Sequence, residues 1–279
     1  MKNNKKISVI IPTHNRSWYL RRAIQSVIDQ DYKNIEIIVI DDASTDDTKE
    51  ALKPFISSNN IIYIRNEKRM GPNHSRNIGL KKATGDYIAF LDDDDYYCDR
   101  GKLRKQINLF EKNSKLGFVG SGYYDKSINK NRIPRVRGKI DKTLLTTFSD
   151  IETSTILIKK EIIDKVGFLD ERFKSEQNHD FFYRISKIAE FDYIPDIAVV
   201  KDNPPSQIST NIKNKLQGYF LFHKKHFEDI RELGAKFFIL IIMKLLITSL
   251  ILVIEAIIGN SLILPKLYET IRNRKYHMQ

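Results

Sequence analysis

The 279-residue sequence is poor in cysteine, proline and glycine, with one, eight and twelve residues of these types. A single cysteine, Cys98, excludes a disulfide framework and a multi-cysteine zinc site, and it fits a reducing compartment. No activating neighbour stands beside Cys98, so we expect this thiol to pack rather than to react. The apolar fraction of 41% excludes collagen-like and wholly disordered chains.

Glycine-rich phosphate loops are also missing, since the first apolar run, residues 7–11, leads directly into Pro12. A sugar-phosphate nucleotidyltransferase should carry such a loop, and a dinucleotide-dependent oxidoreductase should carry G-x-G-x-x-G. The sequence therefore disfavours both classes. The amino terminus has no long apolar stretch, so we expect no secretory signal there.

Negative charge is in deficit, with 47 Lys and Arg against 35 Asp and Glu and a net charge of +12. Half of this excess lies in the last 69 residues, beside the apolar run 237–258. No nucleic-acid-binding motif accompanies the charge, so we expect an anionic membrane partner and no nucleic acid. Lys244 and Glu255 form a narrow polar stripe on this run, which favours a peripheral position at the cytoplasmic membrane face over a true span.

Short apolar runs alternate with amphipathic segments through the first half of the chain, a pattern typical of an α/β fold. The spacing predicts a mostly parallel, Rossmann-like sheet flanked by helices. The predicted strands are residues 7–11, 35–40, 61–64 and 87–91, and the predicted helices are 18–29, from Ser44 or Thr45 to about 52, and 72–82.

From about residue 117 the pattern changes to short strands around a basic segment, 126–142. We predict strands at 117–120, 155–158, 191–194 and 197–200, and helices at 181–188 and 211–232. Prolines at 204 and 205 mark a boundary. The predicted domains are 1–205, with a nucleotide-binding half (1–116) and an acceptor half (117–205), and a basic, apolar helical region at 206–279 that associates with the membrane.

Four consecutive aspartates, residues 92–95, follow the fourth predicted strand. Parallel sheets bind ligands at the carboxyl ends of their strands, and adjacent carboxylates resist full ionisation without a cation. On an extended segment Asp92 and Asp94 would point to one side and Asp93 to the other. Two carboxylates at i and i+2 suit Mg²⁺ or Mn²⁺ completed by phosphate oxygens and water; the alternative is a solvated acidic turn.

Four motifs occur in order along the chain: VIIPTHNR at 9–16, IDDASTD at 40–46, GPNHSRNIG at 71–79 and FLDDDD at 90–95. Together they resemble family 2 glycosyltransferases, collinearly from residue 7 to about 200. The resemblance implies a glycosyltransferase-A fold, a nucleotide-sugar donor, Mn²⁺ or Mg²⁺, and inversion at the anomeric carbon. The implied reaction moves a sugar, probably UDP-linked, to a glycan or lipid-linked acceptor in cell-surface polysaccharide synthesis.

The resemblance also implies residue roles. Asp41 would accept a hydrogen bond from uracil, Arg76 would approach the diphosphate, and Asp94 would bind the metal together with Asp92. As alternatives, Asp41 caps a turn and Arg76 is a surface cation. The donor-binding positions implied are Pro12, Thr13, Asn15, Arg16, Asp41, Gly71, Arg76, Asp92 and Asp93.

The family pattern breaks at the catalytic base. An inverting transfer needs a group to take the acceptor proton, and Asn178 stands where the base is expected if Asp180 is aligned as the second acid and helix N-cap. Either Glu176 serves instead, or the base has been replaced in this chain, or transfer is lost. The last case describes a catalytically silent donor-binding or membrane scaffold protein.

Overall fold

The structure is a computed structural model that describes residues 5–58, 61–146, 151–202 and 212–235, together with 239, 242, 243, 246, 247, 249 and 250. Contacts divide the chain into two compact units. The first comprises Met1–Glu171 and Gln177–Pro205, and the second comprises Arg172–Glu176 and Ser206–Gln279.

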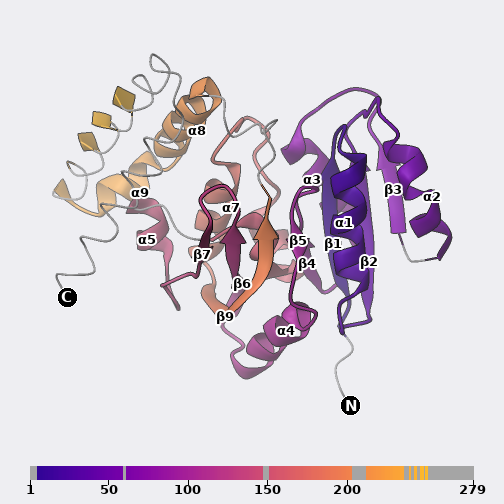
Figure 1. Ribbon diagram of the computed structural model, residues 1–279. Helices are drawn as coiled ribbons and strands as arrows, with labels where there is room; N and C mark the ends of the chain where they lie inside the picture. Colours follow the sequence, from indigo (N-terminus) through magenta and orange to yellow (C-terminus); the bar gives the residue numbers. More distant parts are fainter. Residues whose placement is uncertain are drawn as a thin grey trace. The chain divides into compact units, whose positions relative to one another are not determined.

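One mixed sheet forms the centre of the first unit (Figure 1). Its strand order is β3-β2-β1-β4-β8-β6-β9-β5, and β7 pairs with β6. β1 to β4 are parallel neighbours, β6 and β9 are parallel, and β8 is antiparallel to both β4 and β6. The predicted α/β fold is confirmed, but the prediction of a mostly parallel sheet is wrong, because β5, β7 and β8 pair antiparallel with their neighbours and make the sheet mixed. The strands are β1 Ile7–Thr13, β2 Ile35–Asp41, β3 Ile61–Arg65, β4 Tyr87–Phe90, β5 Tyr96–Tyr97, β6 Leu116–Asp125, β7 Lys130–Arg132, β8 Leu157–Lys159 and β9 Glu190–Lys201.

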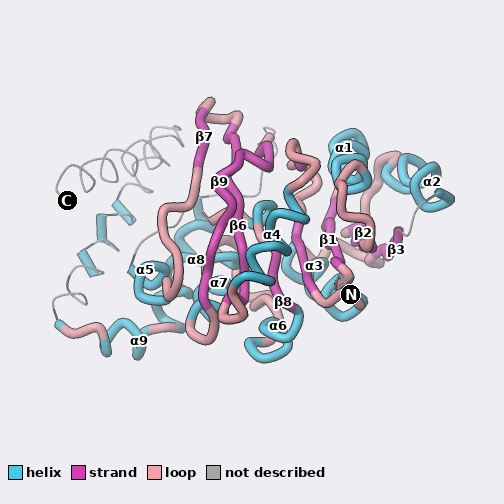
Figure 2. The backbone as a smooth tube through the Cα atoms, turned by 90° about the horizontal axis from the view of Figure 1, so that it is seen from below, coloured by secondary structure: helices cyan, strands magenta, loops and turns pink. Residues whose placement is uncertain are grey.

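Helices cover both faces of this sheet (Figure 2). Side chains of α1, α2 and α4 join one hydrophobic core on one face, while α3 packs on the opposite face of β1 and β2. The helices of the first unit are α1 Ser17–Ile28, α2 Thr48–Ser58, α3 Pro72–Lys82, α4 Lys102–Lys112, α5 Asp141–Thr146, α6 Lys160–Val166 and α7 Gln177–Ser186, with a 3₁₀ turn at Thr153–Thr155.

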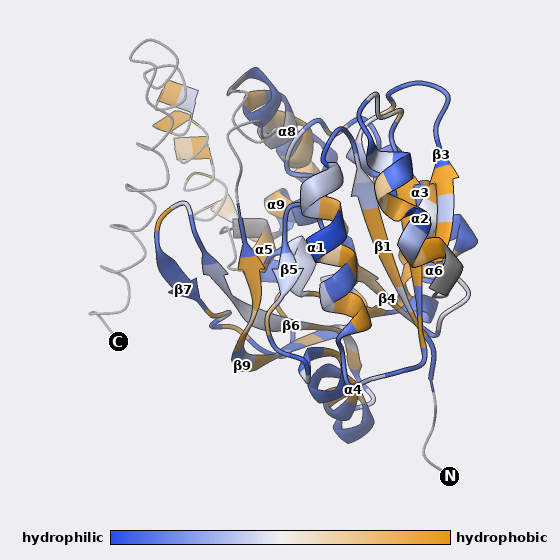
Figure 3. Cartoon of the chain, turned by 45° about the vertical axis from the view of Figure 1, so that its right-hand side comes forward, coloured by the Kyte–Doolittle hydropathy of each residue, from blue (hydrophilic) through white to orange (hydrophobic). Residues whose placement is uncertain are grey.

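Residue alternation along β1 explains the two layers, which Figure 3 shows as largely apolar strands between helices with polar outer surfaces. Ile7, Val9 and Ile11 enter the core shared with α1 and α4. Ile10 points the other way, where a Cβ on Gly79 of α3 would lie 2.4 Å from its Cγ2. Only glycine therefore allows α3 to pack this closely on β1.

Several predicted boundaries are wrong. α2 begins at Thr48, whose N–H and hydroxyl both donate to Asp46, and neither Ser44 nor Thr45 is its N-cap. The strands expected at 191–194 and 197–200 are one strand, β9. The sequence prediction missed α4 and α6. Cys98 is exposed directly after β5, the short strand at the edge of the sheet, so the expectation that it packs is also wrong.

In the second unit, α8 (Ile212–Lys225) and α9 (Phe227–Glu232) replace the single helix predicted at 211–232, with a break at His226. Gln217 of α8 holds the 172–176 segment, because its Nε2 donates to the Arg172 carbonyl oxygen at 2.9 Å and its Oε1 accepts from the Lys174 N–H at 3.2 Å. Most of the apolar run 237–258 lies outside the described residues. Six large apolar side chains that are described between 239 and 250 are 38–67% exposed. Within the described residues, no helix combines the length and hydropathy needed to cross a membrane.

Candidate active site

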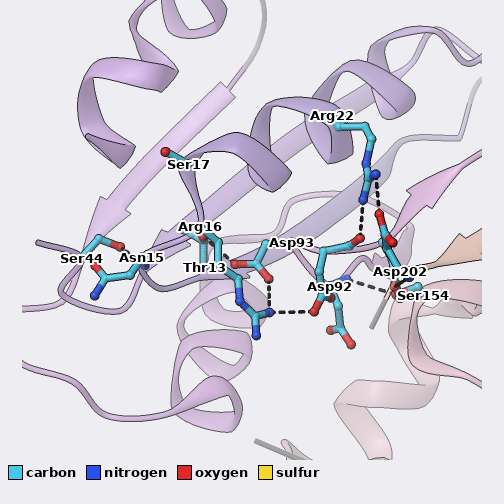
Figure 4. A network of polar contacts seen from close by, with 12 residues as sticks. Thr13, Asn15, Arg16, Ser17, Arg22, Ser44, Asp92, Asp93, Ser154 and Asp202 are labelled. Atoms are coloured by element: carbon cyan, nitrogen blue, oxygen red, sulfur yellow. Dashed lines mark hydrogen bonds and ion pairs between the residues drawn. The ribbon is translucent and has the colours of Figure 1, made fainter. Parts of the chain in front are cut away.

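Three parallel strands deliver their carboxyl ends to one edge of the sheet, because β1 lies between β2 and β4. Thr13 ends β1 opposite Asp41 at the end of β2, and residues 92–95 follow β4. The Thr13 hydroxyl donates to Asp93 Oδ2 at 2.8 Å (Figure 4). The topology thus brings three of the four sequence motifs together at the edge where such sheets bind ligands.

Residues 92–95 form a tight turn, since the Asp95 N–H donates to the Asp92 carbonyl oxygen at 3.0 Å. Asp93 and Asp94 converge on one guanidinium: Arg16 Nη1 lies 2.9 Å from Asp93 Oδ1 and 2.8 Å from Asp94 Oδ2. The predicted alternation, with Asp93 facing away from Asp94, is wrong because a turn does not alternate its side chains as a strand does. Arg16 compensates the charge of two of the four aspartates.

Arg76, in the second turn of α3, is only 4% exposed. Its Nη2 donates to Asp92 Oδ1 at 2.5 Å, whereas Nε and Nη1 find no hydrogen-bond partner among the described residues. Burial excludes the alternative of a surface cation. Buried donors are normally paired, and an unpaired one costs about 1–3 kcal/mol. The two unpaired groups therefore point to an anionic ligand beside Asp92.

Three carboxylates of the turn, those of Asp93, Asp94 and Asp95, are hard to ionise. Burial raises the pKa of Asp93 to about 6, although Arg16 opposes the shift. Burial, with the charge of Asp92 adding to it, also raises the pKa of Asp94 and raises that of Asp95 well above its ordinary value. The expected resistance to ionisation is confirmed, but desolvation contributes more than mutual repulsion.

Asp41 is fully buried, and both its carboxylate oxygens have partners. The Ser44 N–H donates to Oδ1 at 2.7 Å, the Tyr63 hydroxyl donates to Oδ2 at 2.6 Å, and Arg65 Nη1 lies 3.6 Å from Oδ2. Burial and the bond to Asp41 raise the pKa of Tyr63 to about 12. Asp41 therefore does cap its turn. Each carboxylate oxygen has a further lone pair, so the contact to a nucleobase stays a prediction.

The other predicted nucleoside positions differ in accessibility. Pro12 and Thr13 are buried within β1, whereas Asn15 is exposed and has a φ of +53°. The Asn15 Oδ1 accepts a bond from the Thr45 N–H at 2.7 Å, and Ser44 Oγ accepts one from the Asn15 N–H at 3.0 Å. Asn15 thus joins the loops after β1 and β2.

Asp42 lies in the second sequence motif, but the sequence analysis gave it no role. Its Oδ2 accepts a bond from the Gly71 N–H at 2.7 Å, and its Oδ1 accepts one from the Met70 N–H at 2.8 Å. Gly71 has a φ of +93°, which favours glycine, and it precedes Pro72 at the start of α3. Asp42 therefore fixes the loop that leads into α3, and this loop positions α3 and Arg76 at the site.

The sequence analysis also missed Ser154 and Arg22, which stabilise the turn at residues 92–95. Ser154 Oγ donates to Asp95 Oδ2 at 2.6 Å and accepts from the Asp92 N–H at 3.1 Å. Arg22 donates to the Asp94 carbonyl oxygen at 2.7 Å and pairs with Asp202 at 2.6 Å (Figure 4). These partners come from distant segments and belong to no motif, so no local signal could have found them.

The helix cap predicted beside the expected catalytic base is wrong. Asp180 is not a helix N-cap, because α7 already begins at Gln177. It is fully buried and pairs with Arg184, one turn later, at 3.0 Å. Asn178 lies in the first turn of α7 and is half-buried. Glu176, with a φ of +60°, ends the segment assigned to the second unit.

Asp92 and Asp94 have the donor chemistry for a hard divalent cation. The Asp92 side chain is 36% exposed, and carboxylate oxygens are the ligands that Mg²⁺ and Mn²⁺ prefer. Among the described residues no group of three or more His, Cys, Asp or Glu could hold a metal. The two aspartates therefore fit such an ion only together with phosphate oxygens and water.

A parallel-strand edge with paired aspartates and buried arginines defines an α/β protein that binds a phosphorylated ligand. Residues 8–167 match the family described as Glycosyl transferase family 2. The chain belongs to this family and is a glycosyltransferase, as the resemblance of its motifs implied.

Two relatives illustrate the match. An uncharacterized glycosyltransferase of Haemophilus influenzae is 33% identical over 190 residues, which are 67% of this chain and 74% of that protein. The UDP-Glc:alpha-D-GlcNAc-diphosphoundecaprenol beta-1,3-glucosyltransferase WfaP of Escherichia coli is 34% identical over 163 residues, 58% of this chain and 64% of that protein. The chain therefore spans about two thirds to three quarters of these relatives.

Solved structures share the fold. S. aureus TarS 1-349 in complex with UDP-GlcNAc aligns with a TM-score of 0.66 and 21% identity, over 78% of this chain and 65% of that one. The mannosyltransferase PcManGT from Pyrobaculum calidifontis, in complex with GDP-Man and Mn²⁺, aligns with a TM-score of 0.63 and 18% identity, over 81% of this chain and 65% of that one. At such identities these likenesses establish the glycosyltransferase-A-like fold alone.

Proposed function

We propose that this chain transfers a sugar, with inversion, from a UDP-linked nucleotide-sugar to a glycan or lipid-linked acceptor in cell-surface polysaccharide synthesis. The observation that carries the proposal is Arg76, a buried guanidinium with two unpaired N–H groups beside Asp92. A diphosphate supplies the anionic oxygens that such a fork recognises. WfaP, whose name gives a UDP-sugar donor and a lipid-linked acceptor, supports this substrate class.

The donor would lie along the carboxyl edge, between the loop after β1 and the start of α3. Arg76 and the backbone at Gly71 would meet the diphosphate, and Asp41 would select uracil. Asp92 and Asp93 would reach the ribose or metal-bound water. Arg16 would keep Asp93 and Asp94 compensated when no donor is bound, because it already pairs with both.

Asp92 and Asp94 would hold Mn²⁺ or Mg²⁺ with the diphosphate. Such an ion neutralises the charge that develops on the leaving diphosphate. In the transfer, the acceptor hydroxyl oxygen forms a bond to the anomeric carbon while the bond from that carbon to the phosphate oxygen breaks. The electron pair of the broken bond leaves with the nucleoside diphosphate, and the hydroxyl proton goes to a base of this chain or to water.

Nucleotide binding tests the proposal directly. UDP-sugars should raise the melting temperature of the full chain, more with Mn²⁺ than with chelator, and Arg76→Gln should remove most of this shift. Arg104→Gln is the matched control, because that arginine is half-exposed and pairs with Asp31, three residues after the end of α1. No shift with any of a panel of UDP- and GDP-sugars would contradict the proposal, and a shift with GDP-sugars alone would contradict the choice of uracil.

The base decides between an active enzyme and a silent donor-binding protein. If the base was replaced, Asn178→Asp should raise the transfer rate roughly 10²- to 10⁴-fold, the usual contribution of general-base catalysis, with little change in donor affinity. If Glu176 is the base, Glu176→Gln should abolish transfer and Asn178→Asp should change little. Donor hydrolysis and transfer that stay absent in Asn178→Asp, with donor binding intact, would favour the silent scaffold.

The domain organisation and location remain part of this proposal. Residues 1–205 would form the catalytic domain, with the donor half at 1–116 and the acceptor half at 117–205. Residues 206–279 would associate with the membrane as helices at the cytoplasmic face, peripherally. The division of the chain near residue 205 and the exposed apolar side chains between 239 and 250 support it.

A further inference from the structure

Gln106 on α4 is a fully buried glutamine in an otherwise apolar region. Its neighbours on the inner side of that helix, Leu103, Ile107 and Phe110, belong to the hydrophobic core. A buried amide costs stability unless its hydrogen-bonding groups all have partners, and an apolar side chain would avoid this requirement. The role of Gln106 in the core therefore depends on what its amide group holds.

The amide of Gln106 links α4 to two other segments of the first unit. Its Nε2 donates to the Thr155 carbonyl oxygen at 2.8 Å and to the Val119 carbonyl oxygen at 2.9 Å. Its Oε1 accepts a bond from Lys102 Nζ at 3.0 Å. A flipped amide would place Oε1 against two carbonyl oxygens, so the orientation of the side chain is fixed. Gln106 thus holds the 3₁₀ turn at 153–155 against β6.

This 3₁₀ turn carries the hydroxyl that meets the four aspartates. Ser154, its middle residue, is 1% exposed. Its Oγ donates to Asp95 Oδ2 at 2.6 Å and accepts from the Asp92 N–H at 3.1 Å (Figure 4). The other carboxylate oxygen of Asp95 accepts from the Asp202 N–H at 3.3 Å. One hydroxyl group therefore joins the two ends of the segment 92–95.

These bonds give the first and the last aspartate different roles. Asp95 is 4% exposed and both its carboxylate oxygens accept bonds from Ser154 and Asp202, whereas the Asp92 side chain is 36% exposed. The bond from the Asp92 N–H to Ser154 fixes the backbone of the aspartate that is expected to meet the metal. Removing a group that holds a metal ligand in place typically lowers metal affinity about 10- to 100-fold.

We propose that Gln106 and Ser154 are positioning residues for the metal site, although neither contacts the ion. Gln106 holds the 3₁₀ turn, the turn presents the Ser154 hydroxyl, and this hydroxyl fixes Asp92 and keeps Asp95 away from the ion. The inference rests on the proposed function, because it concerns Mn²⁺ or Mg²⁺ bound together with a nucleoside diphosphate. It adds that a buried amide outside every sequence motif sets the affinity for this ion.

The test measures how much Mn²⁺ the full chain needs to bind UDP tightly. Calorimetric titrations of UDP at rising Mn²⁺ give the concentration at which half of the metal-dependent gain in affinity is reached. Ser154→Ala and Gln106→Met should each raise this concentration about 10- to 100-fold. The double variant should raise it no further than the larger single change, because both break the same chain of bonds. UDP affinity in chelator should stay unchanged, since neither variant removes a group assigned to the diphosphate.

Two matched controls separate this role from general stability. Thr153→Val removes the neighbouring hydroxyl, which is buried and has no hydrogen-bond partner among the described residues. Gln30→Met removes another buried glutamine, whose Nε2 donates to the Asp99 carbonyl oxygen at 2.9 Å and whose Oε1 accepts from the Leu103 N–H of α4 at 3.2 Å. Gln30→Met should lower the melting temperature, as Gln106→Met should, but both controls should keep the Mn²⁺ requirement of the parent.

The outcomes distinguish this inference from the proposed function. An unchanged Mn²⁺ requirement in Ser154→Ala would overturn the inference, and a rise in Ser154→Ala without one in Gln106→Met would overturn the role of Gln106. An equal rise in Gln30→Met would also overturn it, by showing that any loosening of α4 is enough. If Gln106→Met does not fold, Ser154→Ala decides, because it removes a single oxygen atom. If the parent itself binds UDP without Mn²⁺ dependence, the proposed metal site fails and this inference fails with it.

Discussion

A buried lysine far from any motif allows a quantitative prediction about stability. Lys102, the first residue of α4, is 0% exposed. Its Nζ donates to Gln106 Oε1 at 3.0 Å and lies 4.2 Å from the centre of the Tyr97 ring. Burial lowers the pKa of Lys102 to about 7, although Asp99 opposes the shift.

The sign of the pH dependence follows from this lowered pKa. Between pH 7 and 10.5 the unfolded chain keeps the Lys102 proton while the folded chain releases it, so the unfolded state binds more protons. Stability must therefore rise with pH across this window. Relative to an unperturbed lysine, the penalty is about 4 kcal/mol at pH 7 and about 1.5 kcal/mol at pH 9.5, at about 1.36 kcal/mol per pKa unit.

Lys102→Met removes the titrating group and keeps most of the side-chain volume. Between pH 7 and 9.5 the free energy of unfolding of the parent should rise by about 3 kcal/mol more than that of the variant, which is the difference between the two penalties. At pH 7 the free energy of unfolding of Lys102→Met should exceed that of the parent by less than about 4 kcal/mol. The reason is that Gln106 loses its hydrogen-bond donor, at a cost of about 1–3 kcal/mol. Urea denaturation followed by circular dichroism at both pH values measures the difference.

Lys105→Met is the control on the same helix. Lys105 is exposed enough to bond both Asp99 and Asp196, and these bonds raise its pKa, so it keeps its proton in folded and unfolded chains alike over this pH range. Its replacement should leave the pH slope unchanged. Equal slopes in the parent and Lys102→Met would refute the reasoning, because other groups titrating in this window cancel in the comparison.

Three further outcomes are expected. Asp94→Ala should abolish the metal-dependent part of UDP binding, so that titration calorimetry with Mn²⁺ and with chelator agree. Asp41→Asn should weaken UDP about ten- to a hundredfold, the loss of one charge-assisted bond of about 1.5–3 kcal/mol, and unchanged UDP affinity would contradict its role. Asp180→Asn should destabilise the fold by about 1–3 kcal/mol without altering UDP binding, because it removes the carboxylate of the ion pair while Arg184 keeps its bonds to the Val166 and Phe168 carbonyl oxygens; thermal denaturation measures the loss.

Much of the sheet and its active edge could be predicted because they depend on local pattern. The runs that became β1, β2 and β4 are apolar except for Ser8 and Glu36, as is typical of strands buried on both faces, and each leads into a polar motif. Their parallel arrangement then places Thr13, Asp41 and Asp92 at one edge. The helix α4 could also have been found, since Leu103, Ile107 and Phe110 follow a helical spacing.

What escaped prediction depends on contacts between distant segments. The partners of the four aspartates decide whether this segment is a strand end or a turn. Arg16 pairs with both Asp93 and Asp94, whereas Ser154 donates a hydrogen bond to Asp95. Asp180 differs, because its partner Arg184 stands one turn later in α7, a local i,i+4 pairing that places Asp180 inside the helix rather than at its cap.

The arginines give these observations a common physical basis. An edge that concentrates carboxylates for a cation must remain folded when neither cation nor donor is bound, and uncompensated buried charges would oppose this. Arg16 compensates Asp93 and Asp94, while Arg76 compensates Asp92 and still retains two unpaired donors. Because Arg76 makes only one bond and has two donors left, a diphosphate can add to its interactions without breaking the one that holds Asp92. A cation that takes Asp94, by contrast, must compete with Arg16, so donor and metal are expected to bind more tightly together than either does alone.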